Sequence, residues 1–293
     1  MKITHAFVAL FLATSAVAKS NFTKLGDISD LLEPCRMKDI EDMNVDFCNC
    51  IEKRNRCEPT PCKVCPSLAG GGVLVKKKTT TCFGCKDADL GCKGCNLWFN
   101  SVCNCIKNDD QPNACLTSSP IQKKGDPVWV LVEDPKHHNL ITPTKPITGI
   151  AELNDKRNVA LGNLGWNFAQ ANYKHKTEAL AMDSWRTRKQ EQVHIHVCNK
   201  NTTLEAMLSK EKIPTDGRLF RLQGDPDLSC VVRPNNGLVF DFSSIIDRFS
   251  EDEFPFMCNA IVGAGIMSDT RGNTWACATT HKAGPVSKFC AKY

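Results

Sequence analysis

The chain has 293 residues, of which 42% are hydrophobic, and a formal net charge of +5, which suits one or two folded domains and favours an anionic partner only weakly. It has no dense basic stretch interleaved with aromatic residues, so composition does not favour nucleic-acid binding. No later segment approaches the roughly 18 apolar residues that a membrane-spanning helix requires, so we expect a soluble mature protein.

The segment 1–18 has the pattern of a secretory signal peptide. Lys2 supplies a positive start, residues 6–13 are an unbroken apolar run, and Ala16-Val-Ala18 is a small-x-small cleavage site. We therefore expect cleavage after Ala18 and secretion to the extracellular space. An uncleaved N-terminal membrane anchor is the alternative.

The cysteines divide the mature chain into two regions. Eighteen cysteines behind a signal peptide indicate an oxidising compartment, and thirteen of them lie between Cys35 and Cys115. Composition changes near residue 120, so we predict a cysteine-rich region at 19–120 and a globular domain at 121–293. Because thirteen is odd, at least one cysteine of the first region is free or pairs outside it.

The cysteine-rich region has too little apolar content for an ordinary core, so we expect a loop-rich structure held by disulfides. It contains a weak internal repeat, in which Cys48-Asn-Cys50-Ile recurs as Cys103-Asn-Cys105-Ile. A second pattern has the spacing of a four-cysteine zinc site, but a signal peptide favours disulfides there, and we assign no metal or cofactor. That pattern is Cys62-x2-Cys65-x16-Cys82-x2-Cys85.

The globular domain is predicted to be α+β with an antiparallel sheet, because strands outnumber helices. Asn158 is the expected N-cap of the longer helix, and one apolar stripe of that helix would contain Val159, Leu164, Phe168 and Ala171. The predicted strands are 128–133, 138–142, 177–183 and 192–198, the helices are 158–173 and 203–210, and a hairpin joins 259–267 to 274–279. Two triplets, at Asn21 and Asn201, match the N-glycosylation acceptor pattern.

The strand at 192–198 carries the most informative side chains. Its alternation places Val193, Ile195 and Val197 in a core and Gln192, His194 and His196 on the other face. Same-face side chains on a strand lie roughly 6.6–7 Å apart, so two imidazoles and an amide can line one ligand. Imidazole transfers protons near neutral pH and can act as a nucleophile.

The residues before this strand favour a phosphate or diphosphate ligand. Hydroxyl, guanidinium and amide groups lead into the histidines, and arginine binds phosphate oxygens in a bidentate way. Two other interpretations remain: a structural histidine pair on an amphipathic strand, and a zinc site that includes Cys198. The polar residues are Ser184, Arg186, Arg188, Gln190, Gln192, His194 and His196.

Three segments, in the same order, resemble the CDP-diacylglycerol pyrophosphatase family of the histidine-triad superfamily. The first is His138-Asn-Leu-Ile-Thr-Pro143-Thr-Lys-Pro-Ile147-Thr-Gly149-Ile150. The second is the run from Asp183 to Cys198, and the third is the late hairpin from Ala260 to Ala276. The resemblance covers about residues 122–285 and leaves the cysteine-rich region without a recognised relative.

The resemblance implies a histidine-triad-like sheet and a two-step displacement. His194 matches the middle triad member and would be the nucleophile, and His196 would contact the phosphoryl oxygens. Ser184, Arg188, Gln190 and Gln192 would bind the substrate. Three positions depart from the family pattern: Gln192 replaces the first histidine, Thr187 a glycine, and Asp183 an asparagine.

From these residues we expect a secreted hydrolase that cleaves the diphosphate of CDP-diacylglycerol into CMP and phosphatidate. A lipid substrate would require peripheral contact with a membrane. One alternative is a histidine-triad hydrolase of a soluble nucleotide diphosphate. Another is a secreted cysteine-rich binding protein whose hydrolase domain is inactive.

Overall fold

The computed structural model describes residues 47, 102, 105–107, 115–118, 128–132, 139–145, 147, 150, 153, 158–184, 187, 193–252, 262–281 and 283–292. All of them lie in one compact unit, Glu33–Tyr293. The signal peptide, the four-cysteine pattern and Asn21 lie outside the described residues. Within the described part of the chain, we find no helix with the length and apolar character needed to cross a bilayer.

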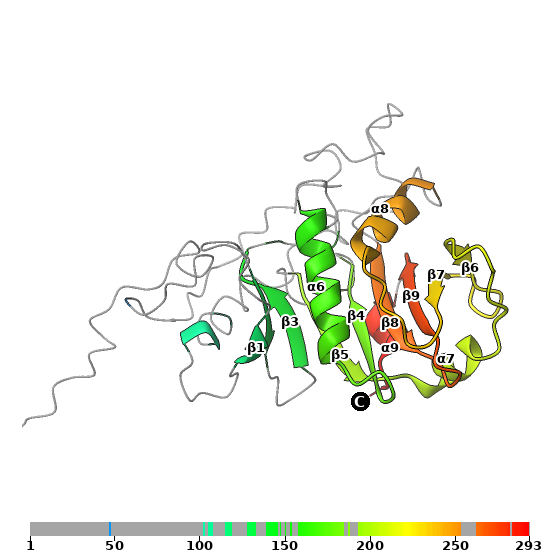
Figure 1. The fold of residues 1–293 in the computed structure, drawn as a ribbon, viewed down its shortest axis with the longest axis horizontal. Helices are drawn as coiled ribbons and strands as arrows, with labels where there is room; N and C mark the ends of the chain where they lie inside the picture. Colours follow the sequence, from blue (N-terminus) through cyan, green and yellow to red (C-terminus); the bar gives the residue numbers. More distant parts are fainter. Residues whose placement is uncertain are drawn as a thin grey trace, which may run out of the picture. The chain divides into compact units, whose positions relative to one another are not determined.

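The described strands form one nine-stranded sheet in the order β1-β2-β3-β5-β4-β8-β9-β7-β6, drawn in Figure 1. Each pair of neighbours is antiparallel, which confirms the predicted α+β class. The strands are β1 (Cys115–Ser118), β2 (Trp129–Val132), β3 (Asn139–Pro143), β4 (Glu178–Met182), β5 (Ile195–Asn199), β6 (Phe220–Arg221), β7 (Leu228–Arg233), β8 (Gly263–Ser268) and β9 (Thr274–Thr279).

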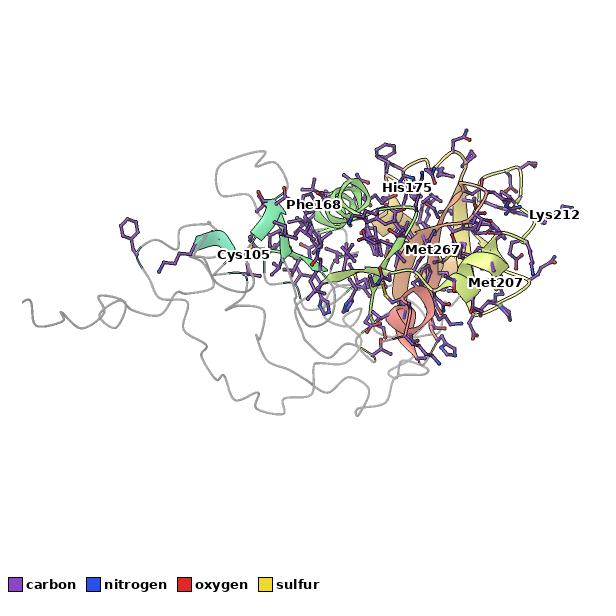
Figure 2. All side chains as sticks on the ribbon, turned by 90° about the horizontal axis from the view of Figure 1, so that it is seen from below. Cys105, Phe168, His175, Met207, Lys212 and Met267 are labelled. Atoms are coloured by element: carbon purple, nitrogen blue, oxygen red, sulfur yellow. A yellow bond between two sulfur atoms is a disulfide. The ribbon has the colours of Figure 1, made fainter. Side chains whose placement is uncertain are left out.

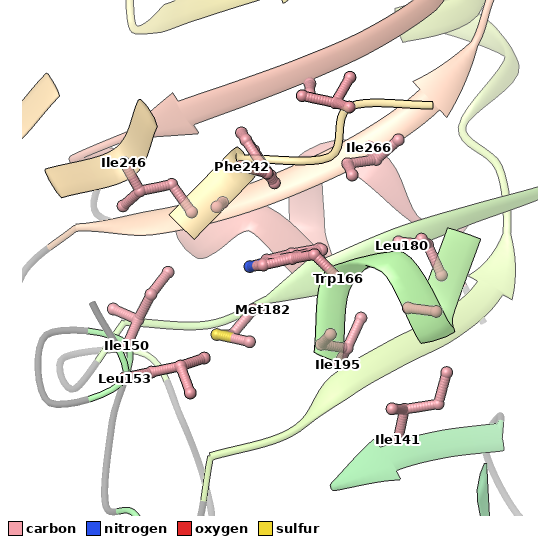
Figure 3. Close-up of a cluster of buried hydrophobic side chains, with 14 of the residues drawn as sticks. Ile141, Ile150, Leu153, Trp166, Leu180, Met182, Ile195, Phe242, Ile246 and Ile266 are labelled. Atoms are coloured by element: carbon pink, nitrogen blue, oxygen red, sulfur yellow. The ribbon is translucent and has the colours of Figure 1, made fainter. Parts of the chain in front are cut away.

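Two helices, α6 (Val159–Asn172) and α8 (Phe242–Asp252), pack side by side over one face of the sheet. Figure 3 shows Trp166 of α6 between the sheet and α8, and its ring meets Phe242 edge to face at a centroid distance of 4.8 Å. The buried side chains of α8 recur at the helical spacing of three and four residues: Phe242, Ile245, Ile246 and Phe249. Burial of such apolar surface is the main contribution that holds the layers together.

Two shorter helices, α7 (Thr202–Leu208) and α9 (Gly284–Phe289), are associated with a second buried cluster on the other face. This face includes Ala179 and Ala181 of β4, Met267 of β8 and Phe289 of α9. Two disulfides add cross-links here, Cys198–Cys290 between β5 and the residue after α9, and Cys230–Cys277 between β7 and β9. They agree with the expected oxidising compartment.

The predicted stripe of α6 is correct at two of its four positions. Phe168 is buried and the partly buried Leu164 packs against the same core, whereas Val159 is only partly buried and Ala171 is exposed. The face that packs against the sheet and α8 also includes Gly162, Gly165, Trp166 and Ala169. A Cβ on Gly165 would overlap the Trp129 ring, and one on Gly162 would overlap Ser243, so glycine lets the helix approach closely.

The helices α6 and α7 begin close to the predicted residues, but only α7 has a side-chain hydrogen bond that caps its start. Asn158 occupies the N-cap position of α6, yet its side chain accepts a hydrogen bond from Lys145 Nζ at 2.8 Å rather than from the helix. Asn201 caps α7, because its Oδ1 accepts from the N–H groups of Thr203 and Leu204. Its Nδ2 donates to the carbonyl of Lys288 at 2.9 Å, so a glycan on Asn201 would have to fit this junction.

Most predicted strands form within one to three residues of their expected limits. The late hairpin is present as β8 and β9, although the residues before Val262 in its first arm lie outside the described residues. The prediction omitted β1, β6, β7, α8 and α9. β1 lies before the proposed boundary at residue 120 and pairs with β2, so the sheet uses residues from both sides of it.

Candidate functional site

The two histidines lie at the start of β5, on the face of the sheet that α9 covers. Val193, Ile195 and Val197 belong to the core under α6 and α8, as the alternation predicts. His194 and His196 therefore share the opposite face, and their ring centroids are 4.7 Å apart at an interplanar angle of 65°. The strand begins at Ile195 rather than at the predicted residue 192, so His194 immediately precedes it.

The two rings differ in exposure. His194 is only 6% exposed, whereas His196 is partly exposed. His196 pairs with Leu140 of β3 on one side and with Ala181 of β4 on the other. Ala181, the β4 residue beside His196, has a small side chain and is itself fully buried. Of the two rings, that of His196 is the more accessible to a ligand.

Helix α9 fills the same face one strand further along. Gly263 and Gly265 of β8 lie under it, and a Cβ on Gly265 would lie 2.6 Å from the ring of Phe289. The Cys198–Cys290 disulfide ties the end of α9 to the strand of the histidines, two residues after His196. The position of α9 relative to the histidines is therefore set by close packing and by a covalent bond.

A tight turn follows β4 at the same end of the sheet. The N–H of Thr187 donates to the carbonyl of Ser184 at 3.1 Å, and the two hydroxyl oxygens are 3.2 Å apart. Ser184, a predicted substrate contact, is only 1% exposed. Its hydroxyl is thus engaged with Thr187 in this turn.

Asp183 and Thr187, two of the departures from the family pattern, both contact the start of α9. Asp183 Oδ1 accepts a hydrogen bond from the N–H of Val286 at 3.3 Å. Gly284, with a φ of +77°, lies where a Cβ would come within 2.7 Å of Asp183 Oδ1 and 2.6 Å of Thr187 Oγ1. The negative charge of Asp183 is therefore directed at a helix N-terminus, where it is favourable.

The threonine at 187 does not require an unfavourable backbone. Among the described residues other than glycine, only Asn235 and Asn236 have positive φ values. A threonine at 187 therefore does not strain the backbone, because its φ is in the range that any L-residue adopts.

The remaining predicted substrate contacts, Arg188, Gln190 and Gln192, lie outside the described residues, as does Arg186. From the predicted motif, the structure places His194 against His196 and Ser184 against Thr187, and it places Asp183 and Thr187 at the start of α9. It adds Thr142 of β3, a fully buried residue whose hydroxyl donates to the carbonyl of Val193 at 2.9 Å. Its only signal in the sequence is a polar residue at the end of an apolar strand.

The structure excludes one ligand of the zinc site that the sequence suggested. Cys198 is bonded to Cys290, and a disulfide sulfur cannot serve as the thiolate ligand that a zinc site uses. Within the described residues, no group of three or more histidine, cysteine or acidic side chains is placed to hold a metal ion.

Two cavities lined by described residues lie away from the histidines. One, of about 840 Å³, borders α7 and includes Met207 and Lys212, which Figure 2 shows well separated from Phe168 of α6. The other, of about 270 Å³, lies at the opposite end of β5 and includes Lys200. The ammonium of Lys200 is occupied by Glu205 at 2.6 Å and by the carbonyls of Ser268 and His175.

Comparison with known proteins adds no relative: no family model matches the chain, and no curated protein matches it. What the described geometry offers is a pair of imidazoles in contact on one face of an antiparallel sheet. Such a pair can combine a nucleophile with a second ring that donates a hydrogen bond to a developing negative charge.

Proposed function

We propose that this protein is a phosphoric anhydride hydrolase that acts through a nucleotidyl-histidine, with CDP-diacylglycerol as the first substrate to test. The observation that carries the proposal is the contact between His194 and His196, whose rings share one face of the sheet. The three-segment resemblance to the CDP-diacylglycerol pyrophosphatases supports the same chemistry and gives His194 the role of nucleophile.

In the proposed reaction, a nitrogen of His194 attacks the phosphorus of the cytidylyl group. The bond from that phosphorus to the bridging oxygen breaks, a phosphorus–nitrogen bond forms, and phosphatidate leaves. Water then attacks the same phosphorus, breaks the phosphorus–nitrogen bond and releases CMP. His196 donates a hydrogen bond to a phosphoryl oxygen in both steps, and Ser184, Arg188, Gln190 and Gln192 bind the phosphates or the ribose.

The first prediction concerns the two histidines. With CDP-diacylglycerol in mixed detergent micelles and the full secreted chain, we expect CMP release that chromatography can follow. His194→Ala should reduce the rate at least about a thousandfold, because loss of a nucleophile typically costs this much or more. His196→Ala should reduce it roughly 100-fold, as for loss of one group that stabilises developing charge.

The matched control is His175→Ala, which removes a partly buried imidazole at the other end of the sheet. It should hydrolyse CDP-diacylglycerol at the wild-type rate. A His194→Ala variant that is folded by circular dichroism and as fast as wild type would contradict the mechanism. Comparing CDP-diacylglycerol with a dinucleotide and a nucleotide sugar separates a lipid from a soluble substrate.

A second candidate function is a secreted cysteine-rich binding protein with an inactive hydrolase domain. The observation that favours it is the 6% exposure of His194, which limits access of a phosphate to the ring. Under this alternative, none of the three classes of nucleotide diphosphate is hydrolysed, and no nucleotidyl-histidine is found by mass spectrometry after acid-free quenching.

A further inference from the structure

The residue before His194 is held by two hydrogen bonds outside the regular ladder of the sheet. The register between β3 and β5 ends at the pair Ile141 and Ile195. Beyond it, the N–H of Val193 donates to the carbonyl of Ile147 at 2.7 Å. The carbonyl of Val193 accepts from the hydroxyl of Thr142 at 2.9 Å. The Thr142 side chain thus supplies a hydrogen bond at the point where the backbone pairing between β3 and β5 ends.

Thr142 occupies the sheet face of the histidines. Ile141 belongs to the core under α6 and α8, so Thr142, the next residue, lies on the opposite side. Leu140, two residues before it, pairs with His196 on that side. Thr142 is 0% exposed, so its hydroxyl has no access to water and keeps its bond to Val193. The oxygen it binds belongs to the peptide unit that joins Val193 to His194.

This bond constrains the histidine itself, because a peptide unit is planar. The carbonyl oxygen of Val193 lies in the same plane as the nitrogen of His194, so the bond from Thr142 restricts rotation of that plane. The N–H of Val193 belongs to the preceding peptide unit, and its bond to Ile147 holds the backbone on the other side of the Val193 Cα. The direction in which the His194 side chain leaves the backbone depends on that plane and on φ of His194, which the pairing of Ile195 with Ile141 restricts from the other side. Val193 is also anchored by its own side chain, which is 3% exposed in the core.

We propose that Thr142 is a positioning residue, which aims the imidazole of His194 by holding the carbonyl of Val193. Its catalytic consequence rests on the proposed hydrolase function, whereas its effect on the orientation of His194 does not. Displacement of a reacting group by about 1 Å typically costs on the order of 100-fold in rate. Loss of the Thr142 hydroxyl should therefore affect turnover more than substrate binding.

Thr144, which lies two residues after Thr142 and directly follows β3, provides a matched control. Thr144 is also buried, at 2% exposed, and its hydroxyl oxygen also makes a hydrogen bond with the backbone. That bond comes from the N–H of Val128, beside β2, at 3.1 Å, and not from the histidine segment. Thr142→Val and Thr144→Val therefore remove the same chemical group from similar surroundings, with only the first in contact with Val193.

The experiment compares Thr142→Val, Thr142→Ser and Thr144→Val in the full chain. With CDP-diacylglycerol, Thr142→Val should lower kcat about 10- to 100-fold with little change in KM. Thr142→Ser, which keeps the donor, should restore most of kcat, and Thr144→Val should keep the wild-type kcat. In parallel, NMR of the histidine rings should show the His194 signals shifted in Thr142→Val and unshifted in Thr144→Val.

The outcomes separate the inference from the proposed function. Wild-type kcat in a folded Thr142→Val, or His194 signals identical to those of wild type, would overturn the positioning role. Failure of Thr142→Ser to restore the lost rate would overturn it as well. If the wild-type protein hydrolyses none of the substrates, the proposed function fails, and the NMR comparison alone decides whether Thr142 orients His194.

Discussion

At the scale of single residues, Asp269 is the clearest case of a charge that the fold requires. Its side chain is completely buried and accepts hydrogen bonds from the N–H groups of Arg271 and Asn273, from the side chains of the same two residues, and from Trp275 Nε1 at 3.0 Å. Burial alone would raise the pKa of Asp269, but these donors together lower it from 3.8. The carboxylate therefore organises the turn between β8 and β9.

The second prediction follows from this site. Because the folded-state pKa of Asp269 is lowered, its contribution to stability is fully present above pH 3.8 and is lost as the pH falls through the folded-state value. In Asp269→Asn, the amide NH₂ group faces hydrogen-bond donors in either orientation of the side chain, so some buried donors lose their acceptor. We therefore expect the free energy of unfolding to fall by about 2–4 kcal/mol at pH 7. Urea unfolding at pH 7 and at pH 3 checks this.

The difference between Asp269→Asn and wild type should narrow at the lower pH, since the carboxyl of the unfolded wild-type chain is then largely protonated and the lowered pKa of the folded state contributes less stability. Asp216→Asn serves as the control, because Asp216 pairs with Arg218 at 2.8 Å with 50% and 76% of the two side chains exposed. An exposed ion pair contributes roughly 0–1 kcal/mol. Equal losses in both variants would contradict the role given to Asp269.

At the scale of secondary-structure elements, α9 is a short helix that packs on the sheet face of the histidines. Its six residues are too few to form a stable isolated helix, so its stability comes from packing. The contact with the sheet is made by Pro285 over Gly263 and by Phe289 over Gly265. Its first turn is held by Asp183, and its end by the disulfide at Cys290.

The third prediction tests this packing. Gly265→Ala adds a Cβ that would lie 2.6 Å from the Phe289 ring, so α9 must shift or the ring must rotate. We expect a loss of about 1–3 kcal/mol in the free energy of unfolding, which is typical of overpacking. Phe289→Leu provides room, so the double variant should lose less than the sum of the two single variants. Strictly additive losses, measured by urea unfolding, would contradict direct contact between these positions.

At the scale of the whole molecule, the disulfides connect the cysteine count to the fold. Residues 121–293 contain five cysteines, and four of them form the bridges Cys198–Cys290 and Cys230–Cys277. The fifth, Cys258, lies outside the described residues. The region 19–120 contains thirteen cysteines, an odd number. Pairing of all eighteen within one chain then requires a single bridge between the two regions.

The fourth prediction is that Cys258 forms this bridge. Proteolysis without reduction, followed by mass spectrometry, should find the Cys258 peptide linked to a peptide from residues 19–120. The peptides of Cys198 with Cys290 and of Cys230 with Cys277 are the internal controls. Alkylation of Cys258 in the folded, unreduced protein would contradict the prediction, since a disulfide sulfur does not react with the alkylating reagent.

The sequence by itself determined the α+β class, most of the strand positions and the face on which the histidines lie. These features depend on local alternation along the chain. Successive side chains of a strand point to opposite faces, so alternating apolar and polar residues give one apolar and one polar face wherever the strand lies in the fold. Val193, Ile195 and Val197 could therefore be assigned to the core.

Only the tertiary structure decided which distant residues contact Val193, beside His194, and Asp183, after β4. Thr142 is separated from Val193 by 51 residues, and α9 contacts Asp183 across 103 residues, so no local pattern indicates either contact. The buried face of α6 was also mispredicted in part, because Gly162 and Gly165 carry no apolar side chain yet allow Ser243 and Trp129 to approach the helix. Close approach depends on the shape of the partner surface, which exists only once the chain has folded.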